Sequence, residues 1–446
     1  MAVEGELHVV MLPWLAMGHL IPFLELSKRL ARKGIVVSFV STPRNIDRVQ
    51  SRIPESLSPL IHLIRLPLPP LHNLPHSAEA TIDLPVEKVH YLKAAFDGLE
   101  VPFDDFLPSA SPDWIICDFA PYWLPPLALK YGLPCAYLSF FSATSMAFFG
   151  PAARMLGLPN KWVTSTDFTS VPKWIPYPSD VVLRKHEIQR ILQSIQENAS
   201  KVIDGYRSCN KLESNALRLL ETDIYEKPII PVGLLPPYVE EMEKSMDEEA
   251  KAKWADISEW LDRQKRVSVV YLALGTEACL TQEEINELAH GLELSELPFF
   301  WVFRKLSVLG DQDAINIELP SGFKERTGDR GVVWEGWAPQ VNILAHPSVG
   351  GFLTHCGWNS IIEALGMMES SNVGLEIPRD EHEGSFTSNS VAKSLKMVMV
   401  EEEVEHLRSN AREIKQIFGD RNLHDGYIDN LIQYLKNHTK LKENQH

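Results

Sequence analysis

Residues Trp337–Glu363 read WAPQVNILAHPSVGGFLTHCGWNSIIE and carry the strongest structural signal in the chain. The apolar run Val349–Thr354 predicts a buried strand, and a short helix near Val341–Ala345 is predicted before it. A second helix opens at Asn359, directly after the glycine and histidine residues that follow the strand. A strand that leads through a tight turn into a helix is typical of a parallel α/β fold.

The predicted start of that helix combines small, polar and aromatic residues. Free backbone amides and the helix dipole favour a pyrophosphate there. Trp337 offers a flat face to a base, and Glu363, one turn into the helix, can accept both hydroxyls of a ribose. A packed turn with buried aromatic side chains is the alternative, which explains Trp337 but not the other residues. Those around the helix start are His355, Gly357, Asn359 and Ser360.

Short β-rich runs alternate with amphipathic stretches on both sides of this segment, which predicts parallel sheets with crossover helices. We expect an α/β fold of two facing, Rossmann-like, doubly wound domains, at 1–235 and 259–420, joined by a charged linker at 236–258. Helices are predicted at Ile21–Lys33 and Glu283–Leu294. The other predicted strands are Leu7–Pro13, Ile35–Ser41, Ile61–Leu66, Trp114–Asp118, Ala136–Phe140, Ser268–Gly275, Phe299–Arg304 and Val332–Trp334.

Ligands of such sheets bind at the carboxyl ends of the strands, where three further residues fall. His19, in a Gly-His turn after the first strand, can take a proton from a hydroxyl, or can be a helix-start histidine without a catalytic role. Asp118 can orient His19, as in catalytic triads, or can cap the next helix. Thr276 can complete the phosphate site from the opposite wall, or can belong to an ordinary turn.

Composition excludes several classes of partner. The 446 residues carry a net charge of -16, whereas nucleic-acid binding needs clustered Lys and Arg. Five cysteines without a CxxC pair, and an N-terminus without a basic region, predict a cytoplasmic protein. The uncharged stretch Pro134–Ala153 suits a strand and a pocket-lining segment better than a membrane span. No GxGxxG follows an early strand, which argues against a dinucleotide-dependent dehydrogenase. No hydrophobic strand leads into Asp311-Gln312-Asp313, which favours a solvated loop over a metal-binding motif.

Trp337–Glu363 resembles the first part of the signature box of plant UDP-dependent glycosyltransferases of family one, which have the two-domain GT-B fold. The resemblance covers nearly the whole chain and includes ICDF at Ile116–Phe119 and SVVYLALGTEA at Ser268–Ala278. STPRNIDR (Ser41–Arg48) and SAEATIDLP (Ser77–Pro85) are most similar to the branch with UDP-rhamnose:rhamnosyltransferase-like and sugar-on-sugar enzymes.

The resemblance implies a role for each matching residue. His19 matches the general base and Asp118 its partner, and Trp358 lies beside the donor sugar. Members of the family invert the configuration at the anomeric carbon and need no metal or other cofactor. We expect a monomer, and we expect its C-terminal helix, 421–446, to pack back toward the first domain. The matches for UDP are Trp337 and Ala338 for uracil, Gln340 and Glu363 for ribose, and His355, Asn359, Ser360 and Thr276 for the diphosphate, with Gly357 in the same box.

The chain departs from the family pattern twice. After Glu363, one strand-helix unit is absent from the second domain, together with the Asp-Gln pair that grips the sugar, and the sequence passes directly to a predicted strand at Val373–Ile377. Near Lys201–Asn215 the family has a longer helix end and a strand before Arg207–Cys209.

Three functions are therefore compared. The leading one is transfer of rhamnose or glucose from a UDP-sugar to a flavonoid or terpenoid glycoside. The alternatives are a catalytically impaired homologue that binds UDP, and a sugar-nucleotide epimerase. Candidate residues for the acceptor pocket, which a plain core segment would also show, are Phe141, Met146, Phe148 and Phe149.

Overall fold

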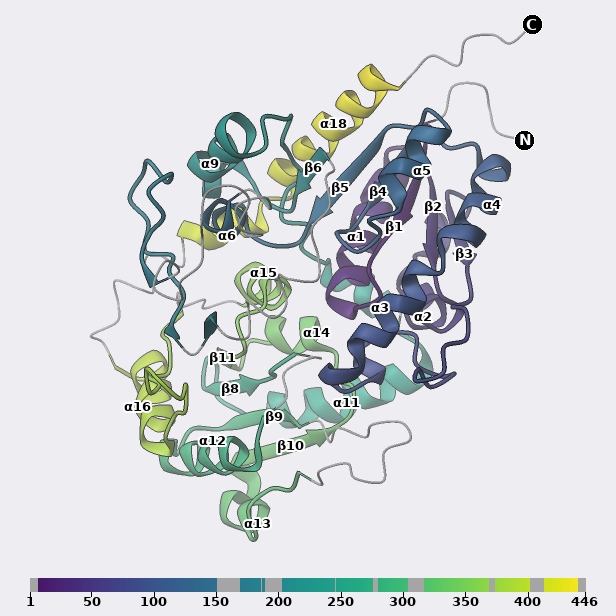
Figure 1. The fold of residues 1–446 in the computed structure, drawn as a ribbon. Coiled ribbons are helices and arrows are strands. Elements are labelled where there is room, and N and C mark those ends of the chain that lie inside the picture. The colour runs from purple at the N-terminus through teal and green to yellow at the C-terminus, as the bar shows by residue number, and fades with distance from the viewer. Residues whose placement is uncertain are drawn as a thin grey trace, which may run out of the picture. The chain divides into compact units, whose positions relative to one another are not determined.

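Two compact α/β units make up the chain in the computed structural model (Figure 1). The structure describes residues 7–150, 169–185, 187–188, 203–244, 246–275, 280–303, 317–368, 374–401 and 413–439. Unit 1 comprises Met1–Leu235 and Arg421–His446, and unit 2 comprises Pro236–Asp420. Each unit contains its own parallel sheet, which confirms the predicted α/β class.

The sheet of unit 1 has the order β3-β2-β1-β4-β5-β6-β7. Its centre is apolar because helices cover both faces: β1 and β4 are almost entirely buried. Leu12 on β1 pairs with Cys117 on β4, so these two strands end side by side. The strands are β1 (His8–Leu12), β2 (Val36–Ser41), β3 (Ile61–Arg65), β4 (Trp114–Cys117), β5 (Cys135–Ser139), β6 (Ile203–Tyr206) and β7 (Ile230–Pro231).

The first helix begins earlier than the sequence predicts. It starts at Met17 after an extended residue, Ala16, so the predicted Gly-His turn is instead its first turn. The amide of His19 donates to the carbonyl of Ala16 at 2.9 Å. The helices of unit 1 are α1 (Met17–Arg32), α2 (Pro43–Val49), α3 (Val89–Asp97), α4 (Glu100–Ala110), α5 (Leu124–Lys130), α6 (Ala143–Phe149), α9 (Asn210–Leu219) and α18 (Arg421–His438).

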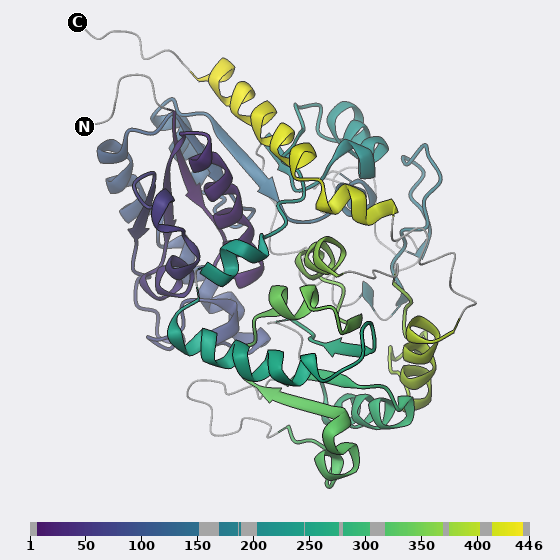
Figure 2. The ribbon, with the colours of Figure 1, turned by 180° about the vertical axis from the view of Figure 1, so that it is seen from behind.

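The C-terminal helix α18 is part of unit 1, and Figure 2 shows its full length. Ile428, Leu431 and Leu435 are buried in the same core as Phe23 of α1. The indole nitrogen of Trp114 donates to the carbonyl of Leu435 at 3.0 Å. These contacts explain why α18, although it is far from the other elements of unit 1 in the sequence, packs in the core of that unit.

Unit 1 contains a strand that the departure from the family pattern predicted to be absent. This strand, β6, lies before Arg207–Cys209 and pairs with β5 and β7. Buried Arg207 follows it and donates from Nε to the carbonyl of Leu234 at 2.7 Å. A four-residue strand suffices here because it has a ladder partner on each side.

Unit 2 has a four-stranded sheet in its described residues, with the order β10-β9-β8-β11. Helices α12 and α16 lie side by side against it (Figure 1). The strands are β8 (Val269–Leu272), β9 (Phe299–Phe303), β10 (Gly331–Glu335) and β11 (Val349–Leu353). The helices are α10 (Val239–Lys244), α11 (Glu248–Asp262), α12 (Gln282–Ser295), α13 (Phe323–Thr327), α14 (Gln340–Ala345), α15 (Trp358–Met367) and α16 (Ser388–Met399).

Two segments of unit 2 differ from the prediction. Residues 236–258, predicted as a linker, contain α10 and most of α11 instead, because Ile257 and its helical neighbours Trp260 and Leu261 are buried in the core. The strand predicted at Val373–Ile377 does not form over its described residues, 374–377. Gly374 there is exposed, and no described strand of the sheet supplies the ladder partner that a strand needs.

Candidate active site

His19 and Asp118 are hydrogen-bonded to each other in unit 1. Nδ1 of His19 lies 2.6 Å from Oδ2 of Asp118, although the two residues are 99 positions apart in the sequence. The register of β1 against β4 explains this contact, because the residues that follow the two strands meet at one edge of the sheet. The structure therefore brings together the two residues that the sequence proposed as a base and its partner.

The carboxylate of Asp118 is fixed on three sides. Oδ2 also accepts the backbone amide of Trp14 at 3.1 Å, and Oδ1 accepts that of Phe119 at 2.7 Å. The side chain is 1% exposed, whereas that of His19 is 19% exposed. A buried carboxylate that accepts hydrogen bonds holds an imidazole in one orientation and stabilises its protonated form.

Aromatic rings pack around the imidazole of His19. The ring centroids of Phe140 and Phe119 lie 5.3 and 5.7 Å from it, both edge to face. Phe140 and the backbone amide of Trp14 also belong to this site, although no sequence motif indicated them. Phe140 follows β5, the strand next to β4, so its place after a strand end was the available signal. Trp14 acts through its backbone, which side-chain motifs do not report.

In unit 2, the two predicted ribose ligands are joined. Nε2 of Gln340, at the start of α14, donates to Oε2 of Glu363 on α15 at 2.7 Å. Tyr271 of β8, which the sequence analysis did not select, lies with its hydroxyl 3.4 Å from Oε1 of Gln340. Trp337 is 40% exposed, and its carbonyl accepts the indole N–H of Trp334 at 3.1 Å. Trp337 therefore offers an accessible indole, and Gln340 holds the carboxylate of Glu363 in position.

His355 lies in the loop between β11 and α15, against two glycines. A Cβ atom on Gly275 would be 2.4 Å from its Cε1, and one on Gly357 would be 2.5 Å from its Nε2. Gly275 has a φ of +80°, and Cys356 next to the histidine has a φ of +58°. The loop ends at Gly357, the residue that caps α15, and no acidic side chain occupies the first turn of that helix. Backbone amides and an exposed imidazole at a helix start suit an anionic ligand.

The remaining predicted donor ligands have different environments. Ala338 and Ser360 are buried. Trp358 and Asn359 are half-buried in the first turn of α15. Thr276 and the Asp311-Gln312-Asp313 motif lie outside the described residues. In the ranges that are described, no group of three His, Cys, Asp or Glu residues could hold a metal ion.

The acceptor candidates do not form one surface. Phe148 is 2% exposed and belongs to a core cluster with Ala143 and Leu220, so it packs in a core, and its place in an acceptor pocket stays a prediction. Met146 and Phe149 pack against the same cluster, and Phe141 is 51% exposed. The apolar pattern of this segment reflects the packing of α6 against α9. Among the described residues, no helix combines the length and the apolar character that crossing a membrane requires.

The fold defines a class of enzyme, the nucleotide-sugar-dependent transferase built from two parallel-sheet domains. The chain superposes on a solved UDP-glucosyltransferase from Polygonum tinctorium with a TM-score of 0.73 and 25% identity, covering 98% of this chain and 100% of that one. Residues 5–114 match the glycosyltransferase N-terminal domain, and residues 189–368 match the UDP-glucoronosyl and UDP-glucosyl transferase family.

Relatives that match over nearly the full length of the chain show the family within this class. The chain is 42% identical to UDP-glycosyltransferase 91C1 of Arabidopsis thaliana, with 97% of each chain covered. It is 39% identical to the soyasaponin III rhamnosyltransferase of Glycine max, with 97% and 96% covered. The chain belongs to the UDP-glycosyltransferase family. The comparisons give no support to the alternative of a catalytically impaired homologue.

Proposed function

We propose that the chain transfers rhamnose or glucose from a UDP-sugar, with inversion, to a hydroxyl of a flavonoid or terpenoid glycoside. The observation that carries the proposal is the 2.6 Å contact between His19 and the buried Asp118, because it supplies an oriented base. The similarity to a rhamnosyltransferase named for a saponin supports a glycoside as the acceptor and rhamnose as one donor sugar.

His19 acts as the general base in this proposal. When the Nδ1–H group of the neutral imidazole donates a hydrogen bond to Asp118, the basic lone pair of the ring is on Nε2. Nε2 removes the proton of the acceptor hydroxyl, and the oxygen attacks the anomeric carbon. The bond from that carbon to the UDP oxygen breaks, and UDP leaves with the electron pair. The proton stays on His19, whose imidazolium Asp118 stabilises.

Unit 2 binds the donor in this proposal. Trp337 stacks on the uracil, and the backbone of Ala338 contacts its edge. Gln340 and Glu363 take the ribose hydroxyls, which their mutual hydrogen bond pre-positions them to do. His355 and the amides at the start of α15 receive the negative charge of the diphosphate, so we propose that no metal is required. A monomeric state and a location in the cytoplasm stay predictions.

Transfer by the purified full chain tests the proposal. UDP-rhamnose and UDP-glucose are each offered with flavonoid and triterpenoid glycosides and with their aglycones, with and without EDTA. We expect transfer to a glycoside that EDTA does not reduce, and a loss of kcat of about a hundredfold or more in His19→Ala. Calorimetry should show that His19→Ala binds UDP as the unaltered chain does. Full activity in His19→Ala, or no transfer to any acceptor by a chain that binds UDP, contradicts the proposal.

A further inference from the structure

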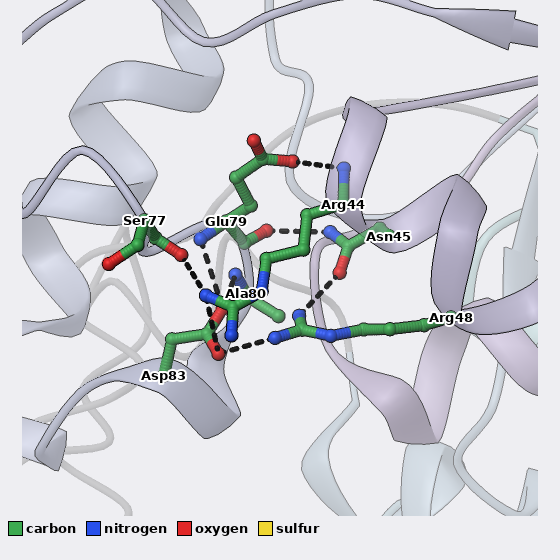
Figure 3. Close-up of polar contacts among 7 residues, drawn as sticks. All are labelled: Arg44, Asn45, Arg48, Ser77, Glu79, Ala80 and Asp83. Atoms are coloured by element: carbon green, nitrogen blue, oxygen red, sulfur yellow. Dashed lines mark hydrogen bonds and ion pairs between the residues drawn. The ribbon is translucent and has the colours of Figure 1, made fainter. Parts of the chain in front are cut away.

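Two segments of unit 1 that are far apart in the sequence are interlocked (Figure 3). They are Ser41–Arg48, which leads from β2 into α2, and Ser77–Asp83, which ends in a short 3-10 helix at Thr81–Asp83. The amide of Arg44 donates to Oε2 of Glu79 at 2.7 Å, and its guanidinium donates to the carbonyl of Ser77. We call this set of contacts the Arg–Asp clasp.

A buried acid and a buried amide form the centre of the clasp. Oδ1 of Asp83 accepts a hydrogen bond from the guanidinium of Arg48, and Oδ2 accepts the amides of Glu79 and Ala80, each at 3.0 Å. Asn45 is fully buried; its Nδ2 donates to the carbonyl of Glu79 at 2.6 Å. Its Oδ1 accepts from Arg48 at 2.8 Å. Charge-assisted bonds with this little exposure hold a segment in one conformation.

The charges inside the clasp balance, which argues against an anion site. The guanidinium groups of Arg44 and Arg48 both pair with Asp83, and the second carboxylate, of Glu79, accepts the backbone amide of Arg44. The side chain of Asp83 is 6% exposed and that of Arg48 is 21% exposed, so the ion pair is largely shielded from water. The contacts therefore serve to fix the backbone at Ser77–Asp83.

That backbone reaches the loop that holds the proposed base. The amide of Thr81 donates to the carbonyl of Leu15 at 2.9 Å. The residue before Leu15 is Trp14, whose amide donates to Oδ2 of Asp118, the same oxygen that lies 2.6 Å from His19. Ala78 and Leu15 are buried in one core cluster, which joins the two segments by packing as well.

We propose that Arg48 and Asp83 are positioning residues for the reaction: through Thr81 and Leu15 the clasp fixes the loop that orients Asp118 and thereby His19. This inference rests on the proposed role of His19 as the base. A base that is displaced by a fraction of an ångström from its productive geometry loses rate but not donor affinity, since UDP is proposed to bind to unit 2. The clasp should therefore affect kcat and leave the KM for the UDP-sugar unchanged.

A pair of substitutions at Thr81 tests the connection directly. Thr81→Pro removes the N–H that donates to Leu15, and proline suits the first position of a short helix, after Ala80 at ψ 161°. Thr81→Ala removes the same side chain but keeps the N–H. We expect kcat to fall about tenfold or more in Thr81→Pro, with unchanged KM for the UDP-sugar, and to stay near that of the unaltered chain in Thr81→Ala.

A second pair keeps the inference falsifiable if Thr81→Pro does not fold. Asp83→Asn removes the charge that pairs with Arg48. The control, Asp47→Asn, removes an exposed carboxylate next to Arg48 on α2, which pairs with Arg65 at 2.8 Å. We expect a roughly tenfold fall in kcat in Asp83→Asn but not in Asp47→Asn. Arg48→Gln should also lose rate, Arg48→Lys should lose less of it, and circular dichroism should show that all four variants are folded.

The outcomes separate this inference from the proposed function. If His19→Ala is inactive but Asp83→Asn and folded Thr81→Pro keep the full kcat, the clasp does not position the base. An equal loss in Thr81→Ala and Thr81→Pro, or a raised KM for the UDP-sugar with unchanged kcat, also overturns the inference. If His19→Ala is fully active, the proposed function itself fails.

Discussion

The imidazole of His355 occupies space that only a glycine at position 357 can leave open. A Cβ atom on Gly357 would lie 2.5 Å from Nε2 of His355, a separation that real Cβ atoms essentially never show. The backbone of Gly357 has a φ of −57°, which any residue can adopt. The constraint at this position is therefore the neighbouring ring and not the conformation of the chain.

Gly357→Ala should displace His355 and weaken UDP binding. We expect Kd to rise about tenfold, the loss of one hydrogen bond to a charged group, measured by calorimetry. Gly366→Ala in the same helix is the control, because its Cβ would meet only Pro236, at 3.7 Å. That variant should bind UDP normally and gain about 0.5–1 kcal/mol of unfolding free energy. Equal Kd values for the two variants would disprove a diphosphate role for His355.

Glu363→Ala should remove the contact with the ribose hydroxyls. The unaltered chain should bind UDP at least about tenfold more tightly than 2′,3′-dideoxy-UDP. In the variant this preference should fall severalfold, because the carboxylate is gone and only Gln340 remains of the two proposed ribose ligands. Glu335→Ala, a carboxylate at the end of β10, is the control and should keep the preference. A Glu363→Ala variant with the same preference as the unaltered chain would contradict a ribose role for Glu363.

Asp118→Asn should reduce transfer without preventing folding. Oδ2 of Asp118 accepts from both His19 and Trp14, and an asparagine has a single acceptor oxygen for these roles and for the amide of Phe119. We expect kcat to fall about a hundredfold or more, with unchanged affinity for UDP. Asp113→Asn, at the other end of β4, changes the carboxylate that accepts the amide of His8 at 2.8 Å and should keep most of the rate. Similar rates in both variants would contradict the role of Asp118.

The stability that Asp104 contributes should depend on pH. A hydrogen bond from Lys130, and to a lesser degree one from Tyr131, lowers the pKa of Asp104 below its ordinary value of 3.8. The bond to Asp104 raises the pKa of Lys130 and that of Tyr131. The contribution is present above pH 3.8 and is lost as the pH falls through the lowered value. Asp104→Asn should therefore lower Tm slightly at pH 7 and have a smaller effect below pH 3.8. A difference in Tm that does not vary with pH would contradict this assignment.

Local sequence predicted most elements to within one or two residues, since the central strands, such as β1, β4 and β8, are continuous apolar runs that are buried in their sheets. It failed where packing overrides the local pattern. Residues 236–258 are charged but place Ile257 in a core, and residues 374–377 alternate like a strand but lack a pairing partner. The start of α1 was missed because the first amides of a helix need no partner within it, so glycine and histidine fit there.

The sequence by itself determined the α/β class, the chemistry of each motif and the family, because these depend on residue types and their spacing along the chain. Only the tertiary structure decided which motifs meet. His19 and Asp118 approach through the pairing of β1 with β4, and Arg48 and Asp83 through the return of the chain after β3. Such contacts are set by strand register and by the burial of shared surfaces, which act between segments that the linear order keeps apart.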